Sequence, residues 1–170
     1  MKKEKMNDKG FSLVELIIVI AIMAVLVVVL APQYLKYVEK SRNSTDLQNA
    51  TEMVTALQVY ASDPDVATAD AYKAGEKFTV TVSSSGTTIG ENNAAAAKAA
   101  LFEAGLSTAK TAEPTTTCVS RTNWTTYVIT GTVADNGSIK FDYSCSGGKS
   151  ADAFANAMAG KTTTSSGSGS

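Results

Sequence analysis

The feature that most constrains this chain is an apolar run near its start. Residues 11–31 contain one ionisable side chain, Glu15, and are otherwise apolar or small. With a rise of about 1.5 Å per residue, about twenty residues form a helix long enough to cross a hydrocarbon core of about 30 Å. We therefore expect residues 11–31 to form a helix that lies in lipid or packs among other apolar helices.

A short charged leader, residues 1–10, precedes this run and ends at Gly10. Its lysines outnumber its acidic residues: Lys2, Lys3, Lys5 and Lys9 stand against Glu4 and Asp8. Because positive charge beside a membrane span favours the cytoplasmic side, we expect the leader to stay in the cytoplasm. The part of the chain beyond the span is then exported.

Glu15 is the exception within the apolar run. A carboxylate at the centre of a membrane span costs about 2.5–3.5 kcal/mol, so such a residue indicates a functional site with a partner. Cleavage after Gly10 would create the only nearby candidate, the amine of Phe11. Residues 11 and 15 lie one turn apart on a helix, so the amine of either the same chain or a neighbouring copy could pair with Glu15.

The sequence Lys9-Gly10-Phe11-Ser12-Leu13-Val14-Glu15, followed by the apolar run, resembles the N-terminus of type IV prepilins and the related pseudopilins. The resemblance implies that a prepilin peptidase cleaves after Gly10 and that the new N-terminal Phe11 is methylated. It also implies that Glu15 pairs with the terminal amine of a neighbouring subunit. It covers about the first third of the chain closely and the rest only in layout.

Two other interpretations of the N-terminus are a secretory signal peptide and a plain single-span anchor. A secretory signal peptide would have to be cleaved after Val29-Leu30-Ala31, directly before Pro32, and its apolar core rarely carries a glutamate. A plain single-span anchor leaves Glu15 without a role. Both explain less of the segment than the prepilin resemblance does.

Composition indicates neither catalysis nor nucleic-acid binding. The net charge is −1, no basic cluster lies beyond the leader, and histidine is absent. We expect no catalytic residues, no metal site and no cofactor. The two cysteines, Cys118 and Cys145, both lie in the exported part, where an even count indicates one disulfide. Closing that loop would contribute roughly 3.5 kcal/mol in the chain-entropy model.

We expect the first helix to continue past Pro32 to about Ala61, because apolar residues recur there at helical spacing. They are Tyr34, Leu35, Val38, Leu47, Ala50, Val54, Leu57 and Ala61, and charged residues such as Glu39 and Asp46 are predicted to lie largely on the other faces. Pro32 removes one backbone donor and should kink or loosen this spine helix. Related pilins have a proline at this distance, where the helix melts locally in the filament.

Beyond Asp63-Pro64-Asp65 the pattern predicts a head of strands and short helices. Residues 66–75 read as a loop or short helix, residues 78–82 as a strand closed by a turn at 83–86, and residues 92–105 as a helix capped by asparagine. A further short helix is expected within 150–159. The last residues, 161–170, are threonine, serine, glycine and one lysine, and are expected to be flexible.

Residues 127–145 predict a hairpin with a defined register. The apolar residues on both strands occupy odd positions, from Tyr127 to Val133 and from Ile139 to Cys145. A two-residue turn would pair odd with even positions and point the apolar residues of the two strands to opposite sides of the sheet. We therefore predict a three-residue loop, 135–137, that pairs Val133 with Ile139. Gly131 would then lie opposite Phe141 and leave room for its ring.

These patterns predict an α+β, pilin-like fold. A spine helix over residues 11–61, with 11–31 as transmembrane or filament-core half, packs on the antiparallel sheet of a head over residues 62–160, in which 118–145 is the disulfide-bounded region. The resemblance implies a type IV pilus subunit that polymerises into a helical homo-oligomer and serves adhesion, twitching motility or biofilm formation. It begins as a single-pass prepilin in the cytoplasmic membrane and ends in an extracellular pilus.

The implied partners are copies of the chain, the prepilin peptidase, and the assembly platform with its ATPase. Two rival functions remain at this point. A pseudopilin of a type II secretion or DNA-uptake machine has the same N-terminus. The second rival is a membrane-tethered enzyme or binding domain that never polymerises. The absence of histidine and of recognisable motifs in the loops argues against it.

Overall fold

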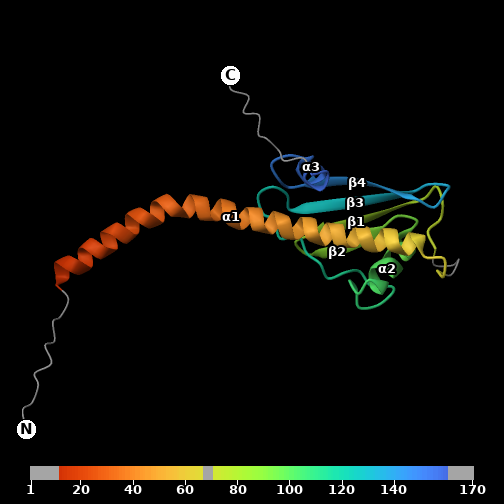
Figure 1. Ribbon diagram of the computed structural model, residues 1–170, viewed down its shortest axis with the longest axis horizontal. Helices are drawn as coiled ribbons and strands as arrows, with labels where there is room; N and C mark the ends of the chain where they lie inside the picture. The colour runs from red at the N-terminus through yellow and green to blue at the C-terminus, as the bar shows by residue number, and fades with distance from the viewer. Residues whose placement is uncertain (1–11, 67–70, 161–170) are drawn as a thin grey trace, which may run out of the picture. The chain divides into compact units, whose positions relative to one another are not determined.

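The computed structural model describes residues 12–66 and 71–160 (Figure 1). The leader with its predicted cleavage site at Gly10 and Phe11, residues 67–70 of the predicted connection, and the tail at 161–170 lie outside the described residues. The elements follow in the order α1 (Leu13–Ser62), β1 (Lys77–Ser83), β2 (Gly86–Gly90), α2 (Ala94–Glu103), β3 (Thr126–Val133), β4 (Ile139–Ser146) and α3 (Ala153–Met158).

Helix α1 confirms the predicted spine. It runs for 50 residues, continues through Pro32, and ends one residue beyond Ala61, directly before Asp63-Pro64. All of its large apolar side chains from Leu13 to Leu30 are exposed, by 50% to 74%. In the described part of the chain, α1 is the one helix that is long and apolar enough to cross a membrane. An apolar surface of this size needs lipid or other apolar helices to cover it.

The chain divides into two compact units after Val38. In the second unit, the C-terminal part of α1 lies along the sheet and supplies one wall of the core (Figure 1). Its buried residues contact the inward side chains of the strands; the two sets are Ala50, Met53, Leu57 and Tyr60 on α1, and Phe78, Val80, Val82, Tyr127 and Ile129 on β1 and β3. A helix on one face of an antiparallel sheet is the predicted α+β arrangement.

Within the described residues the sheet has four antiparallel strands in the order β2-β1-β3-β4. β1 confirms the strand predicted at 78–82. β2 was not predicted. The turn expected at 83–86 connects β1 to β2 in a hairpin, in which Ser83 pairs with Gly86. β2 is only five residues long, with a glycine at each end and two threonines, so its sequence carries a weak strand signal.

The β3–β4 hairpin has the predicted register. Val133 pairs with Ile139 and Tyr127 with Cys145, and the backbone N–H of Ala134 donates to the carbonyl of Ser138 at 2.8 Å. Gly137 has a φ of 80°, as a left-handed residue at the end of a three-residue loop requires. The apolar faces of both strands therefore point to the same side of the sheet.

The predicted pairing of Gly131 with Phe141 is confirmed, but the prediction that Gly131 leaves room for the ring of Phe141 is wrong. Gly131 pairs with Phe141 on β4 and also with Phe78 on β1. A Cβ atom at Gly131 would overlap the ring of Phe78, which is fully buried. The glycine therefore makes room for a core residue of β1 rather than for Phe141.

The two short helices lie against different strands: α2 contacts β2 and β1, and α3 contacts β4 (Figure 1). Asn93 precedes α2, as predicted, but its side chain makes no cap hydrogen bond. Instead its Oδ1 accepts the N–H of Lys73 at 2.9 Å and its Nδ2 donates to the carbonyl of Lys73 at 3.0 Å. Asn93 thus ties the connection after α1 to the start of α2.

Candidate functional site

The first candidate carboxylate, Glu15, lies in the first turn of α1. Its Oε2 accepts a hydrogen bond from the backbone N–H of Ser12 at 2.9 Å, while the carbonyl of Ser12 accepts the N–H of Leu16 at 3.2 Å. Ser12 is therefore the residue before the helix, and Glu15 reaches back to it as the glutamate of a capping box does. The spacing Ser-x-x-Glu signals this cap in the sequence, but the role expected for Glu15 was based on its charge, its position one turn from Phe11 and the resemblance to prepilins.

This geometry places the carboxylate at the residue next to Phe11. Glu15 bonds to the amide of Ser12, the first described residue, and the amine that cleavage after Gly10 would create belongs to the preceding residue. A helix N-terminus favours negative charge in its first turn, so the carboxylate is stabilised there before any partner arrives. Glu15 is thus held one residue from the position at which cleavage after Gly10 would create a new positive charge.

A known sequence motif covers this same segment. The model of the prokaryotic N-terminal methylation motif matches residues 5–31. Residues 5–31 therefore carry a prokaryotic N-terminal methylation motif. The fimbrial protein EcpC of Eikenella corrodens is 41% identical over 76 residues, which are 45% of this chain and 50% of that protein. The type IV major fimbrial protein FimA of Dichelobacter nodosus is 37% identical over 59 residues, 35% of this chain and 38% of FimA.

The pilin-like similarity does not extend over whole chains. The chain matches half or less of the length of these curated relatives. No solved structure matches the chain.

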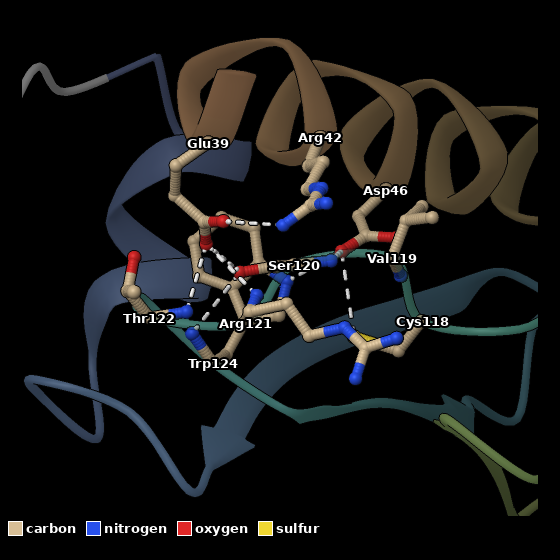
Figure 2. Close-up of polar contacts among 9 residues, drawn as sticks. All are labelled: Glu39, Arg42, Asp46, Cys118, Val119, Ser120, Arg121, Thr122 and Trp124. Atoms are coloured by element: carbon tan, nitrogen blue, oxygen red, sulfur yellow. Dashed lines mark hydrogen bonds and ion pairs between the residues drawn. The ribbon is translucent and has the colours of Figure 1, made fainter. Parts of the chain in front are cut away.

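The second carboxylate site lies in the head, where Asp46 of α1 is fully buried (Figure 2). Its Oδ1 accepts the backbone N–H of Val119 at 2.9 Å. Its Oδ2 accepts the backbone N–H of Ser120 at 3.0 Å and the indole N–H of Trp124 at 2.9 Å. The thiol of Cys118 donates to the same oxygen at 3.4 Å. One helix side chain thus holds the segment that precedes β3.

Glu39 of α1 holds the next two residues of this segment (Figure 2). Its Oε1 accepts the backbone N–H groups of Arg121 and Thr122, each at 2.8 Å. The hydroxyl of Ser120 donates to the same oxygen at 2.8 Å. On the solvent side, Arg42 forms an ion pair with Glu39 at 3.7 Å. Successive N–H groups that converge on one carboxylate form an anion-binding nest.

We call this arrangement the carboxylate clasp: Glu39 and Asp46 on α1, and the residues 118–124 that they bind. Its backbone N–H groups from Val119 to Thr122 donate to the two carboxylates. Buried backbone donors must find acceptors, and here the helix supplies them. Trp124 continues the connection, since its ring packs edge-on against Phe154 of α3 at 5.3 Å. The clasp therefore joins the spine helix to the C-terminal part of the head.

The sequence prediction for these two acids was wrong. Glu39 and Asp46 were expected on the exposed faces of α1, yet Asp46 is fully buried and the side chain of Glu39 is 13% exposed. A signal was present, because the acids are seven residues apart and Asp46 is four residues before the buried Ala50. Both therefore lie on the apolar stripe, where an acid without a partner would be costly.

The environment of Glu39 predicts a pH-dependent stability. Partial burial alone would raise the pKa of Glu39, but the amides of Thr122 and Arg121 and the hydroxyl of Ser120 lower this pKa from 4.5 to about 2. A carboxylate with a lowered pKa stabilises the fold above its ordinary pKa and loses that contribution as the pH falls towards the folded value. We expect the head to lose stability between about pH 4.5 and pH 2.

Thermal unfolding of the Glu39→Gln variant between these pH values measures this contribution. The variant should start less stable at neutral pH, and its stability should fall less steeply with acid than that of the unsubstituted chain. Glu52→Gln, which changes an exposed acid on the same helix, should keep the original slope. Equal slopes for Glu39→Gln and the unsubstituted chain would show that the nest does not bind the carboxylate as described.

The predicted disulfide is not formed in the structure, in which Cys118 and Cys145 are free and buried. The N–H of Cys118 bonds to Ser83 at the end of β1, whereas Cys145 lies on β4, beyond β3. The thiol of Cys118 donates to Asp46 at 3.4 Å, whereas the thiol of Cys145 donates to the carbonyls of Ser150 and Ala151 at 3.4 and 3.2 Å, so each thiol has its own hydrogen-bond partner. Burial and the neighbouring charge of Asp46 also raise the pKa of the Cys118 thiol to about 12.

Proposed function

We propose that this chain is a structural subunit of a type IV pilus and polymerises through the first half of α1. The observation that carries the proposal is the exposed apolar surface of residues 13–30, which lies within the N-terminal methylation motif matched at residues 5–31. Two of the relatives are named a fimbrial protein and a type IV major fimbrial protein. We infer a structural rather than a catalytic role from these names.

The proposed mechanism begins with a membrane-inserted precursor. A prepilin peptidase cleaves after Gly10, the amine of Phe11 is methylated, and the assembly platform with its ATPase moves the subunit from lipid into a helical array. Packing the apolar half of α1 among copies replaces contact with lipid by contact between side chains. Adhesion, twitching motility or biofilm formation is then a property of the finished pilus.

Glu15 supplies the register of this array. In the precursor its carboxylate bonds to the amide of Ser12. After cleavage, the terminal amine of a neighbouring copy is the partner that removes its unpaired charge from an apolar environment. Since each copy has one amine and one Glu15, the pair repeats along the filament and fixes how far one helix is shifted against the next. Pro32 would let α1 adapt locally to its neighbours.

We expect Glu15→Ala to leave cleavage and methylation unchanged but to lower the number of surface filaments by about tenfold or more, since about 1.4 kcal/mol corresponds to a factor of ten. Intact mass of the membrane-extracted chain measures processing, and electron microscopy of sheared surface material counts filaments. Gln48→Ala, an exposed change on the same helix, serves as the control. Normal filament numbers in Glu15→Ala would remove Glu15 from the mechanism.

The same microscopy separates the proposal from its two rivals. Abundant long surface filaments are the expected result. Normal processing with only short assemblies confined to the cell envelope would assign the chain to a pseudopilin machine. A processed chain that stays monomeric would favour a membrane-tethered domain that does not polymerise.

A further inference from the structure

An open groove of about 570 Å³ lies between the second half of α1 and α2 in the head. Small and apolar residues line it, with Ala56 and Val59 from α1, Ala100 and Ala104 from α2, and Leu106 just after α2. Val59 is 64% exposed although it stands beside the core residues Leu57 and Tyr60. An apolar groove with a large exposed side chain on its wall is suited to a partner.

The charged residues of the groove all have the same sign. Glu52, Asp63 and Glu103 line it, and no basic residue does. Among the described residues, neither Glu52 nor Glu103 forms an ion pair. An occupant with apolar side chains and positive charge would pack against the apolar residues of the groove and pair with its acidic residues.

The chain itself offers such a segment at residues 34–42 of α1. Tyr34, Leu35 and Tyr37 are exposed by 68%, 66% and 68%. Lys36 and Lys40 are also exposed and have no ion-pair partner among the described residues. The segment thus combines exposed aromatic rings with unpaired positive charge, which complements an apolar groove with acidic residues.

We propose that the groove between α1 and α2 receives residues 34–42 of a second copy of this chain. The inference rests on the proposed function. Copies that leave the membrane in one orientation have parallel α1 helices, and the contact requires this parallel arrangement. Contact between two different surfaces of the same chain is heterologous, so it repeats from copy to copy and builds a filament rather than a closed dimer.

The spacing along α1 predicts which neighbour makes the contact. In the second unit, Ser41 lies one helical turn from Tyr37 and 18 residues before Val59 in the groove, which is about 27 Å of helix. Contact between Ser41 of one copy and Val59 of another therefore requires their α1 helices to be shifted by about 27 Å. The proposed pair between Glu15 and a neighbour's Phe11 needs a shift of only four residues, about 6 Å. The groove contact therefore joins a copy to a different, more distant neighbour than the Glu15 pair does.

Cysteine cross-linking within filaments tests the contact directly. Ser41→Cys and Val59→Cys are combined in the full chain, filaments are sheared from cells, oxidised and run on a non-reducing gel. We expect a ladder of dimers, trimers and longer products, because each copy then carries one cysteine in the groove and one in the segment that enters the groove of the next copy. Each single variant should give no ladder, and neither should the unsubstituted chain, in which Cys118 and Cys145 are buried.

The matched control combines Val59→Cys with Gln48→Cys. Gln48 is exposed and lies seven residues after Ser41, on the same face of α1 but about two turns further along. It should therefore give no ladder. Filaments of the first double variant that show no ladder would overturn this inference and leave the proposed function standing. Absence of filaments from the unsubstituted chain would instead overturn the proposed function.

Charge reversal provides a second test that does not depend on the cysteines. Glu52→Lys with Glu103→Lys should lower filament yield, and so should Lys36→Glu with Lys40→Glu, because each pair sets like charges against each other across the contact. All four changes together should restore the yield above that of either pair. A combined variant no better than its two parents would contradict the proposed contact.

Discussion

Replacing Asp46 with alanine is expected to lower the free energy of unfolding of the head by about 3 kcal/mol or more. The carboxylate accepts hydrogen bonds from Val119, Ser120 and Trp124 at 2.9 to 3.0 Å and a longer one from Cys118. Removing it leaves buried donors without an acceptor, at about 1–3 kcal/mol each, although water entering the space would offset part of this loss. Domains are commonly stable by only about 5–15 kcal/mol, so the effect should be large.

Urea unfolding of the full chain in detergent, followed by tryptophan fluorescence, measures this loss. Trp124 is the single tryptophan of the chain, and its indole donates to Asp46, so the signal comes from the clasp itself. Asp46→Asn, which keeps one acceptor oxygen, should give an intermediate loss. Asp65→Ala, an exposed acid beyond the end of α1, should unfold like the unsubstituted chain. If Asp46→Ala does too, the clasp does not stabilise the head.

The second large effect is expected from Gly10→Val, which should abolish cleavage and with it all filaments. The resemblance to prepilins assigns cleavage after this glycine, and valine places a branched side chain at the bond to be cut. An uncleaved chain keeps the lysines of the leader next to the apolar half of α1, and burying those charges among other helices would be costly. The terminal amine of Phe11, which we propose as the partner of Glu15, would also be missing.

Intact mass of the chain extracted from membranes measures this prediction, and electron microscopy counts the filaments. The Gly10→Val chain should keep the mass of all ten leader residues. Asp8→Ala, a change elsewhere in the leader, should be processed normally. A Gly10→Val chain of the ordinary mature mass would refute the assigned site.

The parts of the fold that the sequence predicted are those with a strong local pattern. The spine could be predicted because its apolar residues recur over many turns and Pro64 marks its end. The β3–β4 register followed from two apolar sets at odd positions, since a slip of one residue would expose a whole face. The methylation motif could likewise be predicted from a short segment, because the match covers only residues 5–31.

The parts that were missed depend on contacts between distant residues. Whether Asp46 is buried depends on Val119 and Ser120, more than seventy residues later. The use of Asn93 for a bond to Lys73, rather than for capping α2, depends on where the connection after α1 runs. The space at Gly131 is taken by Phe78 because β1 inserts beside β3, a pairing that no local pattern indicated.

Mass spectrometry of the N-terminal peptide from sheared surface filaments is the most direct test of the central claim, that cleavage after Gly10 releases a helix that polymerises. We expect a peptide that begins at Phe11 and carries one methyl group on its amine, in subunits recovered from filaments. A filament subunit that begins at Pro32 or keeps its leader would contradict this claim, as would a processed chain found only as a monomer.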